Sequence, residues 1–369
     1  MQSRVIPISS AWDLGVTVNE YKGFYQAHND SGHLSIPIKT ADFRVEKSTL
    51  IANSKKLRTV IAALESEESN LHDLILEDDK VVSMFILFHC LNKPPVEGSP
   101  NSSAIDVLSI EMKDIWYLVR ACEKYQIDMT TGALKSWFIF WYDWQTHSLN
   151  FNSEAMFPLY KFDHAIGFQS ATHALVYNRE YITEHNPTEK YDQHLRPRIL
   201  QQLNAARGRL RNVLHNNLFN KIAKLLDDGH CKCRKQTFYE YFKELRRIDV
   251  WPLENTTKHS SINQLLDKLE EFNGFNVRLR GVRYCRACDK NWGQVVSEAR
   301  TYVSEYFNGL CLDCMSVSKA LRDGRDPHHE YWYKDVIKQY DRNCRITHGN
   351  STWWYSFMGR REHSEVIAD

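Results

Sequence analysis

The feature that most constrains this chain is the clustering of its cysteines, because seven of the nine lie within residues 231–344. Cys285 and Cys288 form one C-x-x-C pair, and Cys311 and Cys314 form a second pair after a gap of 22 residues. Two such pairs supply four thiolates from two tight turns, which suits tetrahedral Zn²⁺. A redox-active C-x-x-C typically stands alone, so the matching second pair favours metal binding over disulfide exchange. We therefore expect these four cysteines to form a zinc site.

A second set of ligand-type residues brackets the first. Cys231 and Cys233 precede it, and Cys344 and His348 follow it as a C-x-x-x-H motif. We expect these four residues to form a second, Cys₃His site, with unligated thiols as the alternative. Three other histidines are alternatives to His348: His230, His328 and His329. Each expected site has four protein ligands and lacks the open position of a catalytic zinc, so about two structural zinc ions per chain are expected.

The other two cysteines, Cys90 and Cys122, lie in apolar segments of helical periodicity, where a buried core residue is expected. The odd number of cysteines and an N-terminal sequence without the apolar core of a signal peptide favour reduced thiols. We therefore expect an intracellular protein, nuclear and/or cytoplasmic. No apolar run approaches the roughly 18–20 residues that span a bilayer, so no membrane association is expected.

Short strand-like and helix-like segments alternate along residues 41–150. Phe43 and Val45 alternate with polar residues as in a strand, whereas residues 50–64 have apolar side chains at helical intervals. The next predicted elements are a strand with an acidic turn over 71–79, a buried helix over 80–92, and helices over 110–127 and 133–144. These patterns indicate an α+β, mostly helical fold.

This order of elements resembles a BTB/POZ domain. The resemblance lies in FRVEKSTLIANSKKLRTVI (43–61), in LILEDDKVVSMFILFHCLN (74–92) and in the helical segment 112–142. It implies a BTB/POZ-like domain over residues 1–145. BTB folds associate with copies of themselves or with cullin-type scaffolds, so the resemblance also implies protein–protein interaction. For cullin docking, the surfaces near 80–92 and 112–142 are the candidates.

The whole chain is similar to a group of fungal proteins that combine an N-terminal BTB domain with a Cys-rich tail. The similarity lies in FDHAIGFQSATHALVYN (162–178), QLNAARGRLRNVLH (202–215), FNGLCLDCM (307–315) and CRITHGNSTWWYSFMGR (344–360). The pattern of residues 146–230 predicts a helical region. The remainder, 231–369, is expected to be a Cys/His-rich zinc-binding module of the treble-clef-like kind.

Residues 194–229 are predicted to form one long helix with Pro197 in its first turn. Arg207, Arg209 and Arg211 cluster in the middle of this segment. A phosphate-contacting stripe and a solvated or ion-paired face are both compatible with this pattern.

Capping patterns predict further helices after residue 230. The sequences T-x-x-E from Thr237 and S-x-x-Q from Ser261 fit capping boxes. Residues 293–309 have helical spacing and end in a glycine, and residues 311–324 form a predicted helix whose first turn holds the second C-x-x-C pair.

Charge is distributed unevenly along the chain. Residues 1–150 hold 14 Lys/Arg and 19 Asp/Glu, whereas the remainder holds 33 and 27. A mildly basic C-terminal part permits contact with nucleic acid. Four arginines beside the first C-x-x-C pair are the candidate phosphate contacts, with a solvated basic loop as the alternative: Arg278, Arg280, Arg283 and Arg286. A chromatin-associated or nucleic-acid-binding regulator is therefore the alternative function.

Catalytic signatures are missing from the sequence: it has no phosphate-binding loop, dinucleotide fingerprint, zinc-protease motif or nucleophile elbow. The acidic cluster Glu77, Asp78 and Asp79 falls in a predicted turn, where solvation is expected. The main hypothesis is therefore a non-enzymatic adaptor or scaffold, including a substrate adaptor of a cullin ubiquitin ligase, with structural zinc sites.

Overall fold

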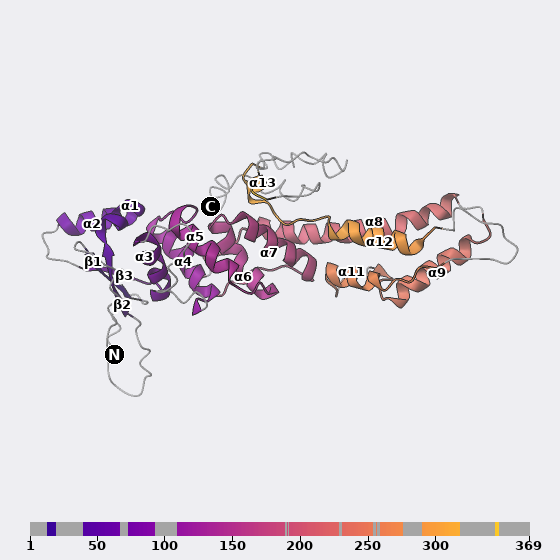
Figure 1. Ribbon diagram of the computed structural model, residues 1–369, viewed down its shortest axis with the longest axis horizontal. Helices are drawn as coiled ribbons and strands as arrows, with labels where there is room; N and C mark the ends of the chain where they lie inside the picture. Colours follow the sequence, from indigo (N-terminus) through magenta and orange to yellow (C-terminus); the bar gives the residue numbers. More distant parts are fainter. Residues whose placement is uncertain are drawn as a thin grey trace, which may run out of the picture. The chain divides into compact units, whose positions relative to one another are not determined.

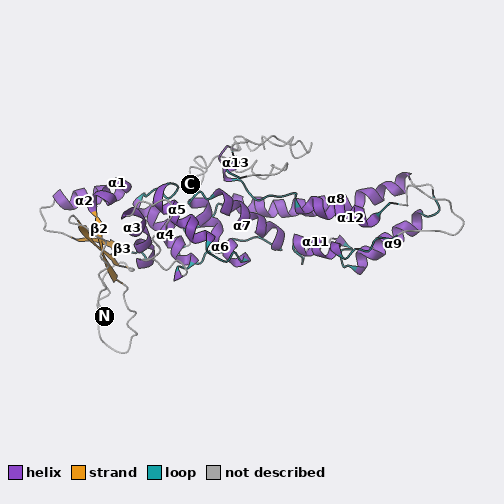
Figure 2. Ribbon diagram, in the orientation of Figure 1, coloured by secondary structure: helices purple, strands orange, loops and turns teal. Residues whose placement is uncertain are grey.

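The computed structural model describes the following residues, and the structural description is confined to them: 13–19, 40–66, 73–92, 109–188, 190, 192–228, 231–253, 256, 259–275, 290–317 and 344–346. Helices dominate this part of the chain, and three strands form one sheet near the N-terminus (Figures 1 and 2). The α+β, mostly helical class is therefore as predicted. No helix in the described ranges combines the length and the apolar character needed to cross a membrane.

The chain divides into two compact units. The first comprises Met1–Thr146, Phe157–His164 and His185–His194. The second comprises His147–Met156, Ala165–Glu184 and Leu195–Asp369. The second unit thus combines most of the expected helical region with the Cys-rich region. The assignment of residues 1–145, 146–230 and 231–369 to three separate domains stays a prediction.

The sheet of the first unit has the strand order β2-β1-β3. Strand β1 (Asp13–Asn19) pairs antiparallel with β2 (Thr40–Glu46) and parallel with β3 (Asp73–Glu77). Strand alternation directs one set of apolar side chains to the same face, and these residues are buried: Val16, Val18, Phe43, Val45, Leu74 and Leu76. Helix α3 (Val81–Asn92) packs on this face, with the Phe43 and Phe88 ring centroids 5.4 Å apart.

Residues 50–64, predicted as one helix, belong to two helices: α1 (Lys47–Asn53) and α2 (Lys55–Ser66). Ser54 between them has an extended backbone and forms a β-bridge with Ile127. The buried Ser54 Oγ donates to the carbonyl oxygen of Tyr125 at 2.5 Å and accepts from the Leu57 N–H at 2.9 Å. The Ser54 backbone keeps the i→i−4 bonds with Leu50 and Arg58, and its side chain caps the N-terminus of α2 by accepting from Leu57, so a new helix starts after Ser54.

The helical core of the first unit is strongly aromatic. It is formed by α4 (Met112–Tyr125), α5 (Gly132–Asp143) and the segment 157–164. Phe138 stacks on Phe162 with ring centroids 4.1 Å apart, and both rings are fully buried. The aromatic residues of 112–142 thus act mainly as core.

The second unit is built around one helix of 32 residues, α8 (Pro197–Asp228). Its first residue is a proline, as predicted. The other elements of this unit are α6 (Leu149–Lys161, shared with the first unit), α7 (Ala165–Asn178), α9 (Arg234–Arg247), α11 (Ile262–Glu270), α12 (Trp292–Ser304) and α13 (Leu312–Val317). Helices α7, α9, α11 and α12 all contact α8.

One of the two predicted capping boxes is present. Ser261 caps α11 through a reciprocal pair of hydrogen bonds with Gln264. Thr237, however, lies inside α9, because this helix already begins after Cys233 and the Thr237 Oγ1 donates to the Cys233 carbonyl oxygen at 3.2 Å. The prediction of a cap at Thr237 was therefore wrong: a buried threonine can satisfy its hydroxyl within a helix by bonding to the preceding turn.

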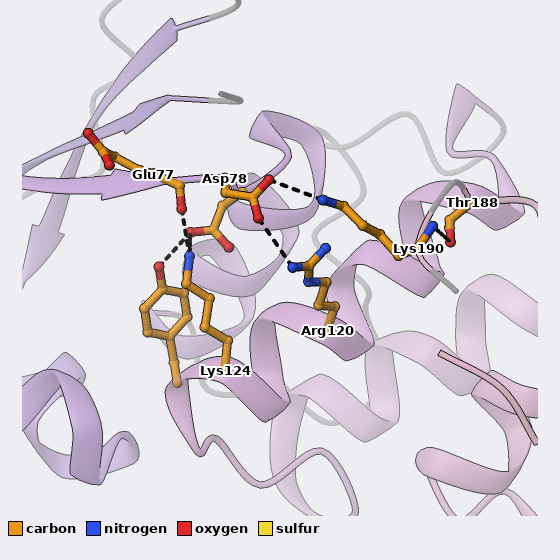
Figure 3. Close-up of polar contacts among 8 residues, drawn as sticks. Glu77, Asp78, Arg120, Lys124, Thr188 and Lys190 are labelled. Atoms are coloured by element: carbon orange, nitrogen blue, oxygen red, sulfur yellow. Dashed lines mark hydrogen bonds and ion pairs between the residues drawn. The ribbon is translucent and has the colours of Figure 1, made fainter. Parts of the chain in front are cut away.

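The acidic turn after β3 connects separate segments of the first unit (Figure 3). Asp78 adopts a positive φ of 60°, and its two carboxylate oxygens face different cations. One oxygen accepts from Lys190 Nζ at 3.3 Å and the other from an Arg120 guanidinium nitrogen at 3.2 Å. Asp78 therefore links β3, α4 and residue 190.

Asp79 is the buried member of this turn, with 5% of its surface exposed. Its carboxylate accepts from Lys124 Nζ at 2.6 Å and from the Tyr125 hydroxyl. Lys124 Nζ also donates to the Glu77 carbonyl oxygen at 2.6 Å. The expectation of a solvated acidic cluster was wrong for Asp79, because α4 supplies the cation and the hydroxyl that make its burial favourable.

Substitution of Asp79 by alanine leaves the Tyr125 hydroxyl and the Lys124 ammonium without this acceptor. We expect Asp79→Ala to lower the free energy of unfolding by about 2–3 kcal/mol, the range for hydrogen bonds to charged groups. The exposed Asp143 provides the control, and Asp143→Ala is expected to change stability by no more than about 0.5 kcal/mol. Denaturant unfolding of both variants measures the difference, and equal effects would contradict a stabilising role for Asp79.

Candidate metal centre

Three cysteine sulfurs come together in the second unit. The Sγ atoms of Cys311, Cys314 and Cys344 all lie within 4.8 Å of one another. Cys314 Sγ is 3.6 Å from Cys344 Sγ, and the Cys314 N–H donates to Cys311 Sγ at 3.4 Å. Cys311 and Cys314 are buried, and Cys344 is half-buried. Three convergent thiols of this kind can hold a metal ion.

An ion pair between Arg345 and Asp313 holds the Cys344 segment against α13. The Arg345 guanidinium donates to both carboxylate oxygens of Asp313, with contacts of 2.7, 2.9 and 3.2 Å. The Arg345 backbone N–H donates to Asp313 Oδ2 at 2.8 Å, and the neighbouring Ile346 is buried. Bidentate pairing of this type fixes orientation as well as distance. It therefore brings Cys344 to the C-x-x-C pair across 30 residues of chain.

The chain leading to Cys311 is fixed on α7. The Tyr177 hydroxyl donates to the Val303 carbonyl oxygen at 2.7 Å and accepts from the Phe307 N–H at 3.1 Å. The Thr172 hydroxyl accepts from the Leu310 N–H at 3.0 Å. Buried backbone groups need such partners, and α7 supplies them from two side chains one and a half turns apart. The segment that carries Cys311 is thereby held on a helix rather than on a free loop.

Gly309 makes the turn that delivers Leu310 and Cys311 to α7. Its φ is +89°, and a Cβ at this position would lie 2.2 Å from the Gln169 carbonyl oxygen. Only glycine combines this backbone conformation with so close an approach to another backbone. The glycine expected to end the helix 293–309 therefore serves this turn instead, since α12 already ends at Ser304.

The three thiols ionise unequally because they share hydrogen bonds. The hydrogen bond from Cys314 lowers the pKa of the Cys311 thiol to about 7, and the same contact raises the pKa of Cys314. Burial raises the pKa of Cys344 to about 11. Thiolates are the metal-binding form, and three of them this close repel one another unless a cation lies between them. Zn²⁺ with Zn–S bonds of about 2.3 Å separates its tetrahedral sulfurs by roughly 3.8 Å. The observed spacing fits such an ion.

The grouping differs from the two nested sites expected from sequence spacing. Within the described ranges, the one group of three potential ligands places Cys344 with Cys311 and Cys314, not with Cys231 and Cys233. The length of α8 explains this difference, because Cys231 and Cys233 follow its C-terminal end.

Contacts at both ends of α8 show the separation. Arg234, beside Cys233, donates to the Leu226 carbonyl oxygen, whereas the chain after α7 is tied to Asn204 through Ile182. From Asn204 to Leu226 the helix rises by about 33 Å at 1.5 Å per residue. The pair Cys311 and Cys344, near α7, is thus remote from the start of α9.

Several predicted site residues lie outside the described ranges, and their roles stay predictions: Cys285, Cys288, His230, His328, His329, His348, Arg278, Arg280, Arg283 and Arg286. Cys90 and Cys122 are buried in the first unit, as predicted. Burial raises the pKa of Cys90 to about 12 and also raises that of Cys122, which keeps both thiols protonated and unreactive at neutral pH.

Comparison with known proteins gives no match: no family model fits the chain, and neither curated proteins nor solved structures are significantly similar to it. The resemblance to BTB/POZ domains therefore rests on the sequence pattern.

The turn at Gly309 offers a test of how the Cys311 segment is held. Gly309→Ala places a Cβ against the Gln169 carbonyl oxygen and forces an alanine to positive φ. We expect this variant to lose about 2–4 kcal/mol of stability in denaturant unfolding. Gly274→Ala is the matched control, because a Cβ there meets its nearest atom at 3.7 Å, and its expected effect is below about 0.5 kcal/mol. Equal stabilities for the two variants would contradict the described docking on α7.

Proposed function

We propose that the chain is a non-enzymatic protein–protein interaction protein, a BTB-type adaptor or scaffold whose C-terminal region is stabilised by zinc. The observation that supports this proposal best is the cluster of Cys311, Cys314 and Cys344. Its sulfurs are largely buried and join two distant segments, which is the behaviour of a structural metal site. A helix as short as α13, with six residues, gains little stability by itself, so a bound ion would supply folding free energy there.

Zinc prefers four ligands, so the proposal requires one more residue at the cluster. His348 follows Cys344 by four residues and is the candidate nearest in sequence. Cys285 and Cys288 are the other candidates, as the sequence pattern suggested. The cysteines that are not used at this site, together with Cys231 and Cys233, remain available for a second zinc ion.

Metal analysis tests the zinc proposal. We expect about two zinc ions per purified chain, and a loss of about one ion in Cys314→Ser, because one of four ligands is removed. Cys122→Ser is the control, since the Cys122 thiol is fully buried in the first unit, and its zinc content should match the wild type. Elemental analysis of the dialysed proteins gives the stoichiometry. A wild-type chain without zinc, or an unchanged content in Cys314→Ser, would contradict this part of the proposal.

The adaptor role has a structural requirement, namely exposed surface for a partner. Helix α3 buries Met84, Leu87 and Phe88, and its exposed apolar side chain is the small Val82, at 42%. Trp144, directly after α5, is 63% exposed, and large exposed aromatic side chains are frequent anchors of protein interfaces. We therefore place the candidate docking surface of the first unit around the C-terminal end of α5 rather than on α3.

Interaction measurements test the adaptor role. We expect the wild-type chain to self-associate in light scattering or to retain a purified cullin-type scaffold in a pull-down. Trp144→Ser should weaken that association at least tenfold, as expected for an interface anchor. Tyr302→Ser is the matched control, because Tyr302 is similarly exposed, at 53%, but lies in the second unit. A strictly monomeric chain that retains no scaffold would contradict the proposal, whatever its zinc content.

A further inference from the structure

A buried arginine lies in the middle of α8. Arg207 has only 9% of its surface exposed, and its Nε atom is buried without a hydrogen-bond partner in the described part of the chain. A guanidinium does not lose its proton in proteins, so this side chain keeps its charge despite its burial. A buried charge without a hydrogen-bonded partner is strongly unfavourable. We therefore infer that Arg207 faces a negatively charged group that the described part of the chain does not supply.

A second guanidinium lies one helical turn further along. Arg211 is half-buried and donates to the Ser260 carbonyl oxygen at 3.3 Å. Burial and the charge of Arg207 lower the pKa of Arg211 to about 10, so the two cations act on each other. The carboxylate whose charge opposes both belongs to Glu180, which is exposed. Because water screens an exposed carboxylate, much of the positive charge of Arg207 remains.

Open space lies next to these two cations. On a helix, Asn204, Arg207, Gly208 and Arg211 occupy the four corners of one surface rhombus, since they are three or four residues apart. A Cβ at Gly208 would meet no heavy atom within 4 Å. Glycine weakens a helix interior relative to alanine, and the described contacts give no packing reason for it here. The Asn204 amide is already occupied: its oxygen accepts from the Ile182 N–H at 3.1 Å, and its nitrogen donates to the Ile182 carbonyl oxygen at 2.8 Å.

We propose that Arg207 and Arg211, together with the space beside Gly208, bind a phosphate group. A guanidinium presents parallel N–H donors that match the oxygens of a phosphate, and arginine is the preferred residue for such contacts. A phosphate dianion supplies negative charge to the buried Arg207 guanidinium, and its three terminal oxygens can accept hydrogen bonds from both arginines at once, more than a carboxylate can accept. Free phosphate and a phosphate monoester share this chemistry.

Thermal unfolding of the full chain tests the site. Inorganic phosphate at millimolar concentration should raise Tm by about 2–4 °C over sodium chloride of equal ionic strength, as expected for a ligand that binds only the folded state. O-phosphoserine in a parallel titration distinguishes the two sources: a larger shift at equal concentration assigns the site to a monoester, and a smaller one to free phosphate.

Three variants separate binding from folding. Arg207→Met should raise Tm in phosphate-free buffer, because it removes an unpaired buried charge, and should abolish the phosphate shift. Gly208→Leu keeps both arginines and favours the helix, yet fills the open space, so it should also abolish the shift. Arg209→Met removes the same charge from a position about 200° around the helix from Arg207 and should retain the shift.

Two results would overturn the proposal. The first is an absence of any shift with both phosphate compounds in the wild-type chain. The second is an equal shift in the wild type, Arg207→Met and Arg209→Met, which would assign the effect to general anion stabilisation. Zinc content is measured in the same samples, so that a loss of the metal is not mistaken for a loss of the phosphate site.

Discussion

The second unit depends on one uninterrupted helix, because α7, α9, α11 and α12 all pack against α8. A helix of 32 residues is about 48 Å long, which makes it a rigid spacer as well as a core element. Its buried apolar stripe includes Leu203, Leu210, Leu214 and Leu218. The spacer function decides which cysteines can meet. Cys231 and Cys233, which lie directly after its C-terminal end, are kept away from the segments that return to α7, and this separation is consistent with Cys344 lying beside the second C-x-x-C pair.

Periodicity predicted the elements of this fold better than it predicted their ends. The buried strands, the helix after the acidic turn and the start of α8 at Pro197 all follow from local patterns that no distant contact opposes. The break at Ser54 could not be predicted from periodicity, because Ser54 also bonds to Tyr125, 71 residues away, and local patterns do not contain that contact. Thr237 and Ser261 begin similar capping motifs in the sequence. Ser261 becomes a cap because α11 starts directly after it, whereas α9 already starts at Arg234, before Thr237.

The cysteine cluster illustrates the same limit in the candidate site. Spacing identified Cys311 and Cys314 as a pair that can bind metal, because both members lie within one short turn. Which other residues join such a pair depends on where long helices deliver the chain, and spacing does not contain that information. The contact that brings Cys344 into place is an ion pair between Asp313 and Arg345. From the sequence alone, both charged side chains would be expected to be solvated.

Burial of charge connects three parts of this molecule, and the balance differs in each. At Asp79 the fold supplies a cation and a hydroxyl, so the buried carboxylate is satisfied from within the chain. At the cysteine cluster the fold gathers groups that become mutually repulsive anions once ionised, which a cation relieves. At Arg207 it buries a cation whose Nε has no hydrogen-bond partner in the described part of the chain, and the proposed phosphate would supply the opposite charge. The first cluster is satisfied within the chain, whereas a bound ion is proposed for each of the other two. A buried charge that has its partner within the chain, as Asp79 does, is structural, and a buried charge without one in the described contacts is where a bound ion is proposed.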